Sequence, residues 1–281
     1  MNETDRVAGE HDADSPEHSG EAGDPGARPS RPRPWASGRT PRLRLRRSTV
    51  LLTAGALLAG VAFATVFAFA VTKLNGRTQP PRPSGIPASV STSLARLMQL
   101  SPVPHVTAPG FTLTDQSGHR LSLASFRGRT VVLTFMDSHC TDICPFVSRE
   151  FIDASKDLGP AAKRVVFVAV NVNPYHLRVS DVASFSRAQR LDSIGSWHFV
   201  TGSLKSLRAV WNNYQIFVQA PSQNADVVHT SLIYFIAPNG QERYVTAPMV
   251  DHTNKHIAFL PAGQLADWGR GIALVARAIT P

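Results

Sequence analysis

The sequence predicts an α/β domain with a mixed sheet flanked by helices, preceded by a single N-terminal transmembrane helix. Continuous apolar runs at Thr130–Phe135 and Val165–Val172 have the length of strands buried on both faces, and segments with helical spacing of apolar residues alternate with them. Such an alternation, closed by a hairpin and a helix, is typical of an α/β sandwich. No residue from Ser48 to Thr72 is charged, and about 20 apolar residues are enough to span a bilayer.

Residues 1–47 form a polar arm whose second half is basic. Large apolar side chains are scarce in it, so we expect the arm to be disordered. Eight arginines and no acidic residue lie between Arg28 and Arg47, directly before the apolar run. Because positive charge stays on the cytoplasmic side, we expect a single-pass cell-membrane protein with a cytoplasmic N-terminus and an extracytoplasmic C-terminal domain. This cluster is simpler to interpret as a topology signal than as a nucleic-acid-binding arm, so we expect no nucleic-acid partner.

The transmembrane segment, residues 48–72, is longer than the apolar part of a signal peptide and follows a long arm, so we expect an uncleaved anchor. A cleaved signal peptide is the alternative. Residues 73–104 predict a semi-rigid linker with one short helix at 91–100, because six prolines lie in this segment: Pro80, Pro81, Pro83, Pro87, Pro102 and Pro104.

Residues 105–281 are then expected to form the globular domain. Its apolar spacing and turn residues predict a hairpin at 111–123, a helix directly after each of the two buried strands, and a further helix before the closing hairpin. The expected helices are 146–158, 181–190, 204–213 and 265–279, and the expected closing strands are 231–236 and 243–245.

The chain has two cysteines, Cys140 and Cys144, which directly follow the first buried strand. Ligands and chemistry gather at the carboxyl ends of strands in α/β sheets. Side chains four positions apart share a face if the turn is helical, and a helix N-terminus stabilises thiolates, while Pro145 suits a first helical turn. The pair therefore predicts a redox couple or a metal site, and we expect it to form a reversible disulfide.

Two sulfurs alone do not distinguish redox chemistry from metal binding, so the histidines matter. His229 opens an apolar run that ends at Ile236. Taken alone it is more often an ordinary histidine, but in a thioredoxin-like topology this strand begins beside the helix turn that carries the cysteines. Two thiolates and one imidazole suit copper, as Cu(I) or Cu(II), whereas zinc accepts the same donors but usually takes four ligands. Three further histidines are interpreted as surface or opposite-face residues: His139, His252 and His256.

The motif His139–Pro145, together with Phe111–Leu113 and His229 ahead of Leu232–Gly240, resembles the Sco/SenC family of copper-binding proteins for cytochrome c oxidase assembly. The resemblance covers about residues 111–279. It implies a thioredoxin-like fold and a metallochaperone whose copper ligands are Cys140, Cys144 and His229. The partner that it implies is subunit II of cytochrome c oxidase, whose copper site the family is thought to load by handing over copper, by reducing that site's cysteines, or both.

The chain departs from the family pattern at two positions. Thr141 replaces a common proline, and Asn173 stands where an aspartate is usual. Because Asn173 has no carboxylate, this chain lacks any role that the aspartate would have in recognising a partner or tuning the site.

Copper binding and delivery is not an enzymatic function. Two other functions are alternatives to it. A thiol–disulfide oxidoreductase would use the same cysteines, but its usual Cys-x-x-Cys spacing is one residue shorter and Ser231 is near where its proline would fall. A peroxide- or redox-sensing domain would need an arginine beside the reactive cysteine, and we expect Arg149 to face solvent instead. The ligand set therefore favours copper binding.

Overall fold

The computed structural model describes residues 83–281. The predicted arm (1–47), the predicted transmembrane helix (48–72) and the first part of the predicted linker lie outside the described residues. Within 83–281, none of the helices has the length and apolar character needed to cross a bilayer.

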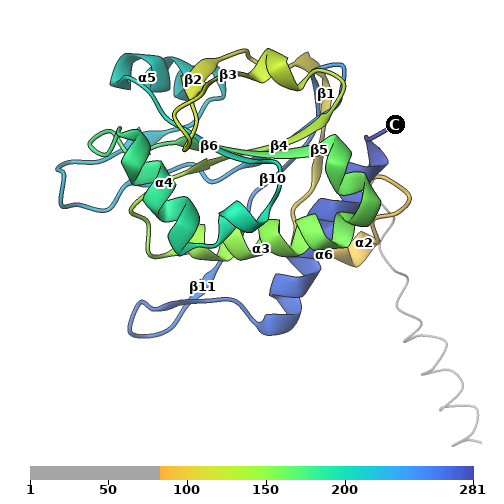
Figure 1. The fold of residues 1–281 in the computed structure, drawn as a ribbon. Helices are drawn as coiled ribbons and strands as arrows, with labels where there is room; N and C mark the ends of the chain where they lie inside the picture. The colour runs from red at the N-terminus through yellow and green to blue at the C-terminus, as the bar shows by residue number, and fades with distance from the viewer. Residues whose placement is uncertain (1–82) are drawn as a thin grey trace, which may run out of the picture. The chain divides into compact units, whose positions relative to one another are not determined.

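A six-stranded mixed sheet forms the centre of the domain, in the order β1-β10-β9-β4-β5-β6 (Figure 1). Strands β4, β5 and β6 run parallel, whereas β9, β10 and β1 continue the sheet in antiparallel pairs. The strand bounds are β1 Ser101–Thr107, β4 Thr130–Met136, β5 Val165–Asn171, β6 Trp197–Val200, β9 Ile233–Ile236 and β10 Gln241–Thr246. The mixed sheet expected from the sequence is therefore present.

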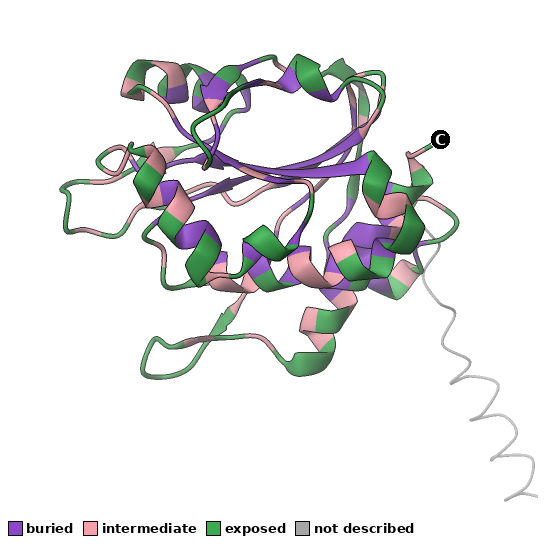
Figure 2. Cartoon of the chain, in the orientation of Figure 1, coloured by how far each residue is buried: buried purple, intermediate pink, exposed green. Residues whose placement is uncertain are grey.

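Helices cover both faces of this sheet because β4 and β5 are apolar on both sides. Val132 and Met136 of β4 face one apolar cluster, and Val131, Leu133 and Phe135 face the other. Figure 2 shows the central strands as buried. The first face is covered by α2 Thr92–Leu97, α3 Ile143–Leu158, α4 Val179–Ala188 and α6 Ala262–Ala278, and the second by α5 Leu204–Asn213 and the 3-10 helix η1 Leu123–Phe126.

Three short hairpins and two further 3-10 helices complete the described part. The hairpin predicted at 111–123 is confirmed, whereas the other two hairpins and β6 were not predicted from the sequence. The hairpins are β2 Thr112–Thr114 with β3 Arg120–Ser122, β7 Val218–Gln219 with β8 Val228–His229, and β11 Asp251–His252 with β12 Ala258–Phe259. The 3-10 helices are η2 Gly159–Arg164 and η3 Leu191–Ser193.

Helix α3 is held rigidly because its apolar stripe is buried and α6 approaches it closely. Val147, Phe151 and Ala154 recur at helical spacing and are buried. A Cβ atom at Gly269 of α6 would lie 2.9 Å from Asp153 Cβ, which is closer than non-bonded carbon atoms approach each other. Glycine therefore permits the close approach of α6 to α3 at this point.

The folded domain begins earlier than residue 105, inside the segment expected to be a linker. Leu94, Met98 and Leu100 are buried in the core, and α2 packs on α6. Strand β1 pairs with β10 at the edge of the sheet, with a break in register between Pro102 and Val106. Prolines that indicated a linker are accommodated here because an edge strand tolerates residues that lack an N–H donor.

The connection β4-α3-β5 is a parallel βαβ unit, and the β9-β10 hairpin followed by α6 lies on the other side of β4. This is the thioredoxin-like arrangement that the sequence predicted. It places the loop after β4 at the point where a parallel neighbour, β5, and an antiparallel neighbour, β9, flank the same strand. Open α/β sheets commonly bind ligands at the carboxyl ends of their strands, where neighbouring connections leave in different directions.

Candidate metal centre

The cysteine loop leaves β4 at Asp137 and enters α3 at Ile143. The N–H of Cys140 donates to the Asp137 carbonyl at 3.2 Å, which closes the loop into a turn. Cys140 thus precedes the helix, while Cys144 is its second residue. The local structure brings both sulfurs to the helix N-terminus, where the helix dipole favours negative charge.

The two thiols lie against each other and neither is in a disulfide. The backbone N–H of Cys144 donates to Cys140 Sγ at 3.4 Å. Cys144 is buried, with 2% of its surface exposed, whereas Cys140 is only partly buried. One sulfur is therefore reachable from outside and the other is behind it.

The contact between the thiols separates their acidities. A hydrogen bond from the Cys144 thiol lowers the pKa of Cys140 below its ordinary value, and the backbone N–H groups of Cys144 and Asp142 act in the same direction. The same thiol–thiol hydrogen bond, together with burial, raises the pKa of Cys144 well above its ordinary value. Cys140 is therefore the more readily ionised thiol, and thiolate is the form that binds metals and attacks disulfides.

His229 ends the short strand β8 and is poised as a neutral imidazole. Its Nδ1 lies 3.1 Å from the Thr230 carbonyl oxygen, which can only accept, so Nδ1 carries the proton. Burial lowers the pKa of His229, which keeps the ring neutral near pH 7. Nε2 then has a free lone pair, and a histidine held through its other nitrogen by a carbonyl is the usual form of a metal ligand.

A cavity of about 610 Å³ lies between the cysteine loop and His229. Cys140 and His229 both line it, and three segments form its walls: the cysteine loop with the start of α3, the segment 226–231, and the tip of the β11–β12 hairpin at 256–258. Within 83–281, no three His, Cys, Asp or Glu side chains already lie close enough together to hold a metal ion. The structure therefore joins the two cysteines directly and brings His229 to the same cavity, without assembling a finished coordination sphere.

The donors at this cavity fit copper by their chemistry. Two cysteine sulfurs, one of them readily ionised, and one neutral imidazole are the soft and intermediate donors that copper prefers. Three acidic residues, Asp137, Asp142 and Asp226, are also among the residues that line the cavity, and negative charge near it favours a cation.

A buried polar network supports the loop from behind. Asp137 Oδ1 accepts hydrogen bonds of 2.8 Å from Asn173 Nδ2 and from the His139 N–H. Asn173 Oδ1 accepts in turn from the N–H groups of Tyr175 and His176, at 2.9 Å and 3.1 Å. The amide at position 173 therefore ties the loop after β5 to the loop after β4.

The positions of His139 and Arg149 bear on the competing functions. The His139 ring is outside the cavity lining and stacks on His176, with ring centroids 3.5 Å apart. The Arg149 side chain is 59% exposed and pairs with Asp153, so it faces solvent.

The position of the β11–β12 hairpin beside the cysteine loop was not predicted from the sequence. His252 is exposed, as the sequence predicted, and its Nε2 also lies 2.9 Å from Asp142 Oδ1 in the cysteine loop. His256 lines the cavity with Cys140 and His229. No local pattern reveals this, because the contact joins residues 110 positions apart in the sequence.

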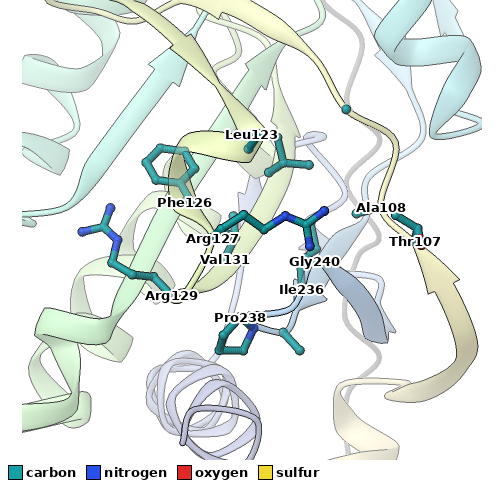
Figure 3. Close-up of a pocket in the computed structure, with 13 residues that line it drawn as sticks. Thr107, Ala108, Leu123, Phe126, Arg127, Arg129, Val131, Ile236, Pro238 and Gly240 are labelled. Carbon is teal, nitrogen blue, oxygen red and sulfur yellow. The ribbon is translucent and has the colours of Figure 1, made fainter.

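A second, smaller cavity of about 220 Å³ lies at the opposite end of β4 (Figure 3). Its walls are mostly apolar, and Arg127 and Arg129 stand at its edge. Arg127 reaches over Gly240 and donates to the Asn239 carbonyl. None of the predicted site residues lines this cavity, so the candidate site is the one at the cysteine loop.

The part of the chain that is similar to known proteins contains the cysteine loop and His229. The family model described as SCO1/SenC matches residues 101–259. The SCO1 protein homolog of Bacillus subtilis is 27% identical over 140 residues, which cover 47% of this chain and 68% of that protein. The mitochondrial SCO2 homolog of Bos taurus is 28% identical over 136 residues, so the match spans half the length of that relative. The crystal structure of Arabidopsis thaliana ScoI with copper bound is 21% identical, with a TM-score of 0.46, and the alignment covers 52% of this chain and 90% of that one.

Proposed function

This chain belongs to the SCO1/SenC family, and from that membership we propose that it binds copper through Cys140, Cys144 and His229 and delivers the ion to a client protein. The observation that carries the proposal is the cavity at the cysteine loop. It is bordered by the accessible thiol of Cys140 and the neutral imidazole of His229, with Cys144 in contact with Cys140.

The three donors suit both oxidation states of copper. Two thiolates hold Cu(I) in low coordination, whereas Cu(II) needs the imidazole as a further ligand. Loading requires Cys144 to lose its proton, because its thiol is protonated in the metal-free chain and its pKa is raised. The protons released on binding make copper affinity increase with pH.

The client that the family resemblance favours is subunit II of cytochrome c oxidase. The mouth of the cavity suits a protein partner, because Val228 and Ile257 line it and are 60% and 61% exposed. Apolar side chains beside a metal cavity give a protein client a surface to dock on while the ion is transferred.

We also propose that the domain works on the extracytoplasmic side of the cell membrane, tethered by the helix predicted at 48–72. The arginines that precede Ser48 support this orientation. A reporter fused after Pro281 should be active only outside the cytoplasm, and cytoplasmic activity would overturn the orientation.

Copper stoichiometry of the full-length chain tests the binding proposal. The reduced protein should bind a single copper ion, and Cys140→Ser and Cys144→Ser should each abolish binding. His119→Ala, which removes an exposed histidine in the β2–β3 turn, is the matched control and should bind copper like the unmodified chain. The proposal fails if either cysteine variant retains full copper binding.

A second candidate function is supported by the asymmetry of the two thiols. Cys140 is accessible and its pKa is lowered, while Cys144 is buried behind it with a raised pKa. In a thiol–disulfide exchange, the Cys140 thiolate would attack a client disulfide and release one client thiol. Cys144 would then displace the second client thiol, leaving a Cys140–Cys144 disulfide and passing two electrons to the client. Copper-free reduction of a disulfide peptide that needs both cysteines but not His229 would favour this activity.

A further inference from the structure

The β11–β12 hairpin is an exposed excursion between β10 and α6 that lies below the N-terminal end of α3 (Figure 1). Its two strands have two residues each, Asp251–His252 and Ala258–Phe259. A ladder this short has little stability of its own, so its position depends on contacts with the rest of the domain.

One contact between the hairpin and the rest of the domain is made to the cysteine loop itself. His252 Nε2 lies 2.9 Å from Asp142 Oδ1 and 3.1 Å from Oδ2. Asp142 occupies the N-cap position of α3, yet its side chain makes no capping hydrogen bond to that helix. An aspartate at this position usually caps the helix, whereas the side chain of Asp142 contacts His252 of the hairpin instead.

The tip of the hairpin holds His256 in a defined, unfavourable backbone conformation. The φ angle of His256 is +57°, in the left-handed region that disfavours residues with a side chain. Thr253 fixes this turn: its carbonyl accepts from the His256 N–H at 2.8 Å, and its N–H donates to the Ile257 carbonyl at 2.9 Å. Glycine or asparagine would suit the backbone better, so the imidazole is kept at a conformational cost.

His256 lines the same cavity as Cys140 and His229. We propose that the hairpin is part of the copper site, with His256 supplying a second imidazole donor to copper and the His252–Asp142 contact positioning the hairpin for it. The inference rests on the proposed copper-binding function. Cys140, Cys144 and His229 provide three donors, and Cu(II) bound in a tetragonal geometry takes a fourth.

The test uses the full-length chain titrated with Cu(II), because Cu(II) depends on nitrogen donors more than Cu(I) does. His256→Asn keeps a residue that tolerates the left-handed backbone and removes the imidazole. Electron paramagnetic resonance should show coupling to two imidazole nitrogens in the unmodified chain and to one in His256→Asn. Cu(II) affinity should fall by about tenfold or more, while Cu(I) affinity changes little. Lys255→Ala, on the same hairpin, is the matched control and should change neither.

A second pair of variants tests the positioning role of His252. His252→Ala removes the contact with Asp142 and should weaken Cu(II) binding by about tenfold, as changes behind a metal ligand usually do. His252→Gln restores an N–H donor and should recover most of the loss. Recovery by glutamine is not expected if His252 is itself a copper ligand.

The outcomes separate this inference from the copper proposal. If Cys140→Ser abolishes copper binding while His256→Asn leaves the nitrogen coupling and the Cu(II) affinity unchanged, the hairpin has no part in the site and only this inference is overturned. If the unmodified chain binds no copper, both the inference and the proposed function are overturned.

Discussion

Asn173 Nδ2 donates a 2.8 Å hydrogen bond to Asp137 Oδ1, and both side chains are buried where the loops after β4 and β5 meet. The resemblance to the Sco/SenC family implies an aspartate at position 173, whereas this chain has a neutral amide there and a carboxylate at 137. A second carboxylate at 173 would face Asp137 at hydrogen-bond distance in a buried place. The amide of Asn173 is therefore matched to the carboxylate of Asp137, so that a single carboxylate lies behind the cysteine loop.

We predict that Asn173→Asp destabilises the fold by roughly 1–3 kcal/mol at pH 7, because it removes a buried donor and adds like charge. The double variant Asp137→Asn with Asn173→Asp should recover much of the loss, since the amide and the carboxylate then exchange roles. Denaturant unfolding of the four proteins in this cycle measures the coupling. Equal destabilisation of the single and double variants would show that the charge arrangement does not matter.

The acidities of the two thiols predict an order of chemical reactivity. With copper absent, iodoacetamide at neutral pH should modify Cys140 first, because its pKa is lowered and its side chain is partly accessible, while Cys144 is buried with a raised pKa. Cys144→Ala should slow modification of Cys140, since the lost thiol donor lets the Cys140 pKa rise. Peptide mass mapping over time follows both reactions. Faster modification of Cys144 than of Cys140 would contradict the arrangement described here.

We predict that mild oxidation joins Cys140 and Cys144 in a disulfide, with loss of two electrons and two protons. The two thiols are hydrogen-bonded to each other at the start of α3, so little movement of the chain is needed to join them. The oxidised protein should bind copper far more weakly, because both thiolates are consumed, and a dithiol reductant should restore binding. Unchanged copper affinity after verified disulfide formation would exclude these sulfurs as the ligands.

Glu150 predicts an unusual dependence of stability on pH. The side chain is buried on α3, its Oε2 has no hydrogen-bond partner within residues 83–281, and burial raises its pKa to about 8. The folded chain therefore keeps a proton that the unfolded chain loses near pH 4.5, so this group lowers the free energy of unfolding as pH rises from about 4.5 to about 8.

Glu150→Gln should remove this slope and, near pH 9, should stabilise the fold by a few kcal/mol relative to the unmodified chain. Near pH 4 the two proteins should be similar. Asp157→Asn, at an exposed position of the same helix, is the control and should leave the slope in place. Denaturant unfolding at a series of pH values measures the effect, and parallel curves for Glu150→Gln and the unmodified chain would rule it out.

The sequence predicted those parts of the fold that depend on local patterns. Thr130–Phe135 and Val165–Val172 are apolar on both faces, which is a clear signal in the sequence, and helices do cover both sides of β4 and β5. The confirmed helix over 204–213 has the same origin in the spacing of its buried residues, Leu207, Val210 and Trp211. The two-residue strands of the small hairpins are too short for any periodicity.

The start of the domain was harder to predict, because the proline-rich composition of this segment indicates a linker although the segment is part of the sheet. Pro102 and Pro104 are typical of a linker, yet they lie in β1, which is tolerated only because β1 is an edge strand. The cysteine pair was found from its spacing, and His229 from its place before a strand. The His252–Asp142 contact depends on where a distant hairpin packs, which sequence spacing does not record.

The most direct test of the central claim is the Cu(II) spectrum of the full-length chain with His229→Ala, compared with His139→Ala. His139 adjoins Cys140 in sequence but stacks on His176 outside the cavity lining, so it is a matched histidine close to the site. We predict that His229→Ala weakens Cu(II) binding and shifts or removes the thiolate-to-copper charge-transfer absorption, while Cu(I) binding suffers less and His139→Ala leaves the spectrum unchanged. Loss of the Cu(II) spectrum in His139→Ala, with an intact spectrum in His229→Ala, would contradict the assignment of His229 as the third ligand.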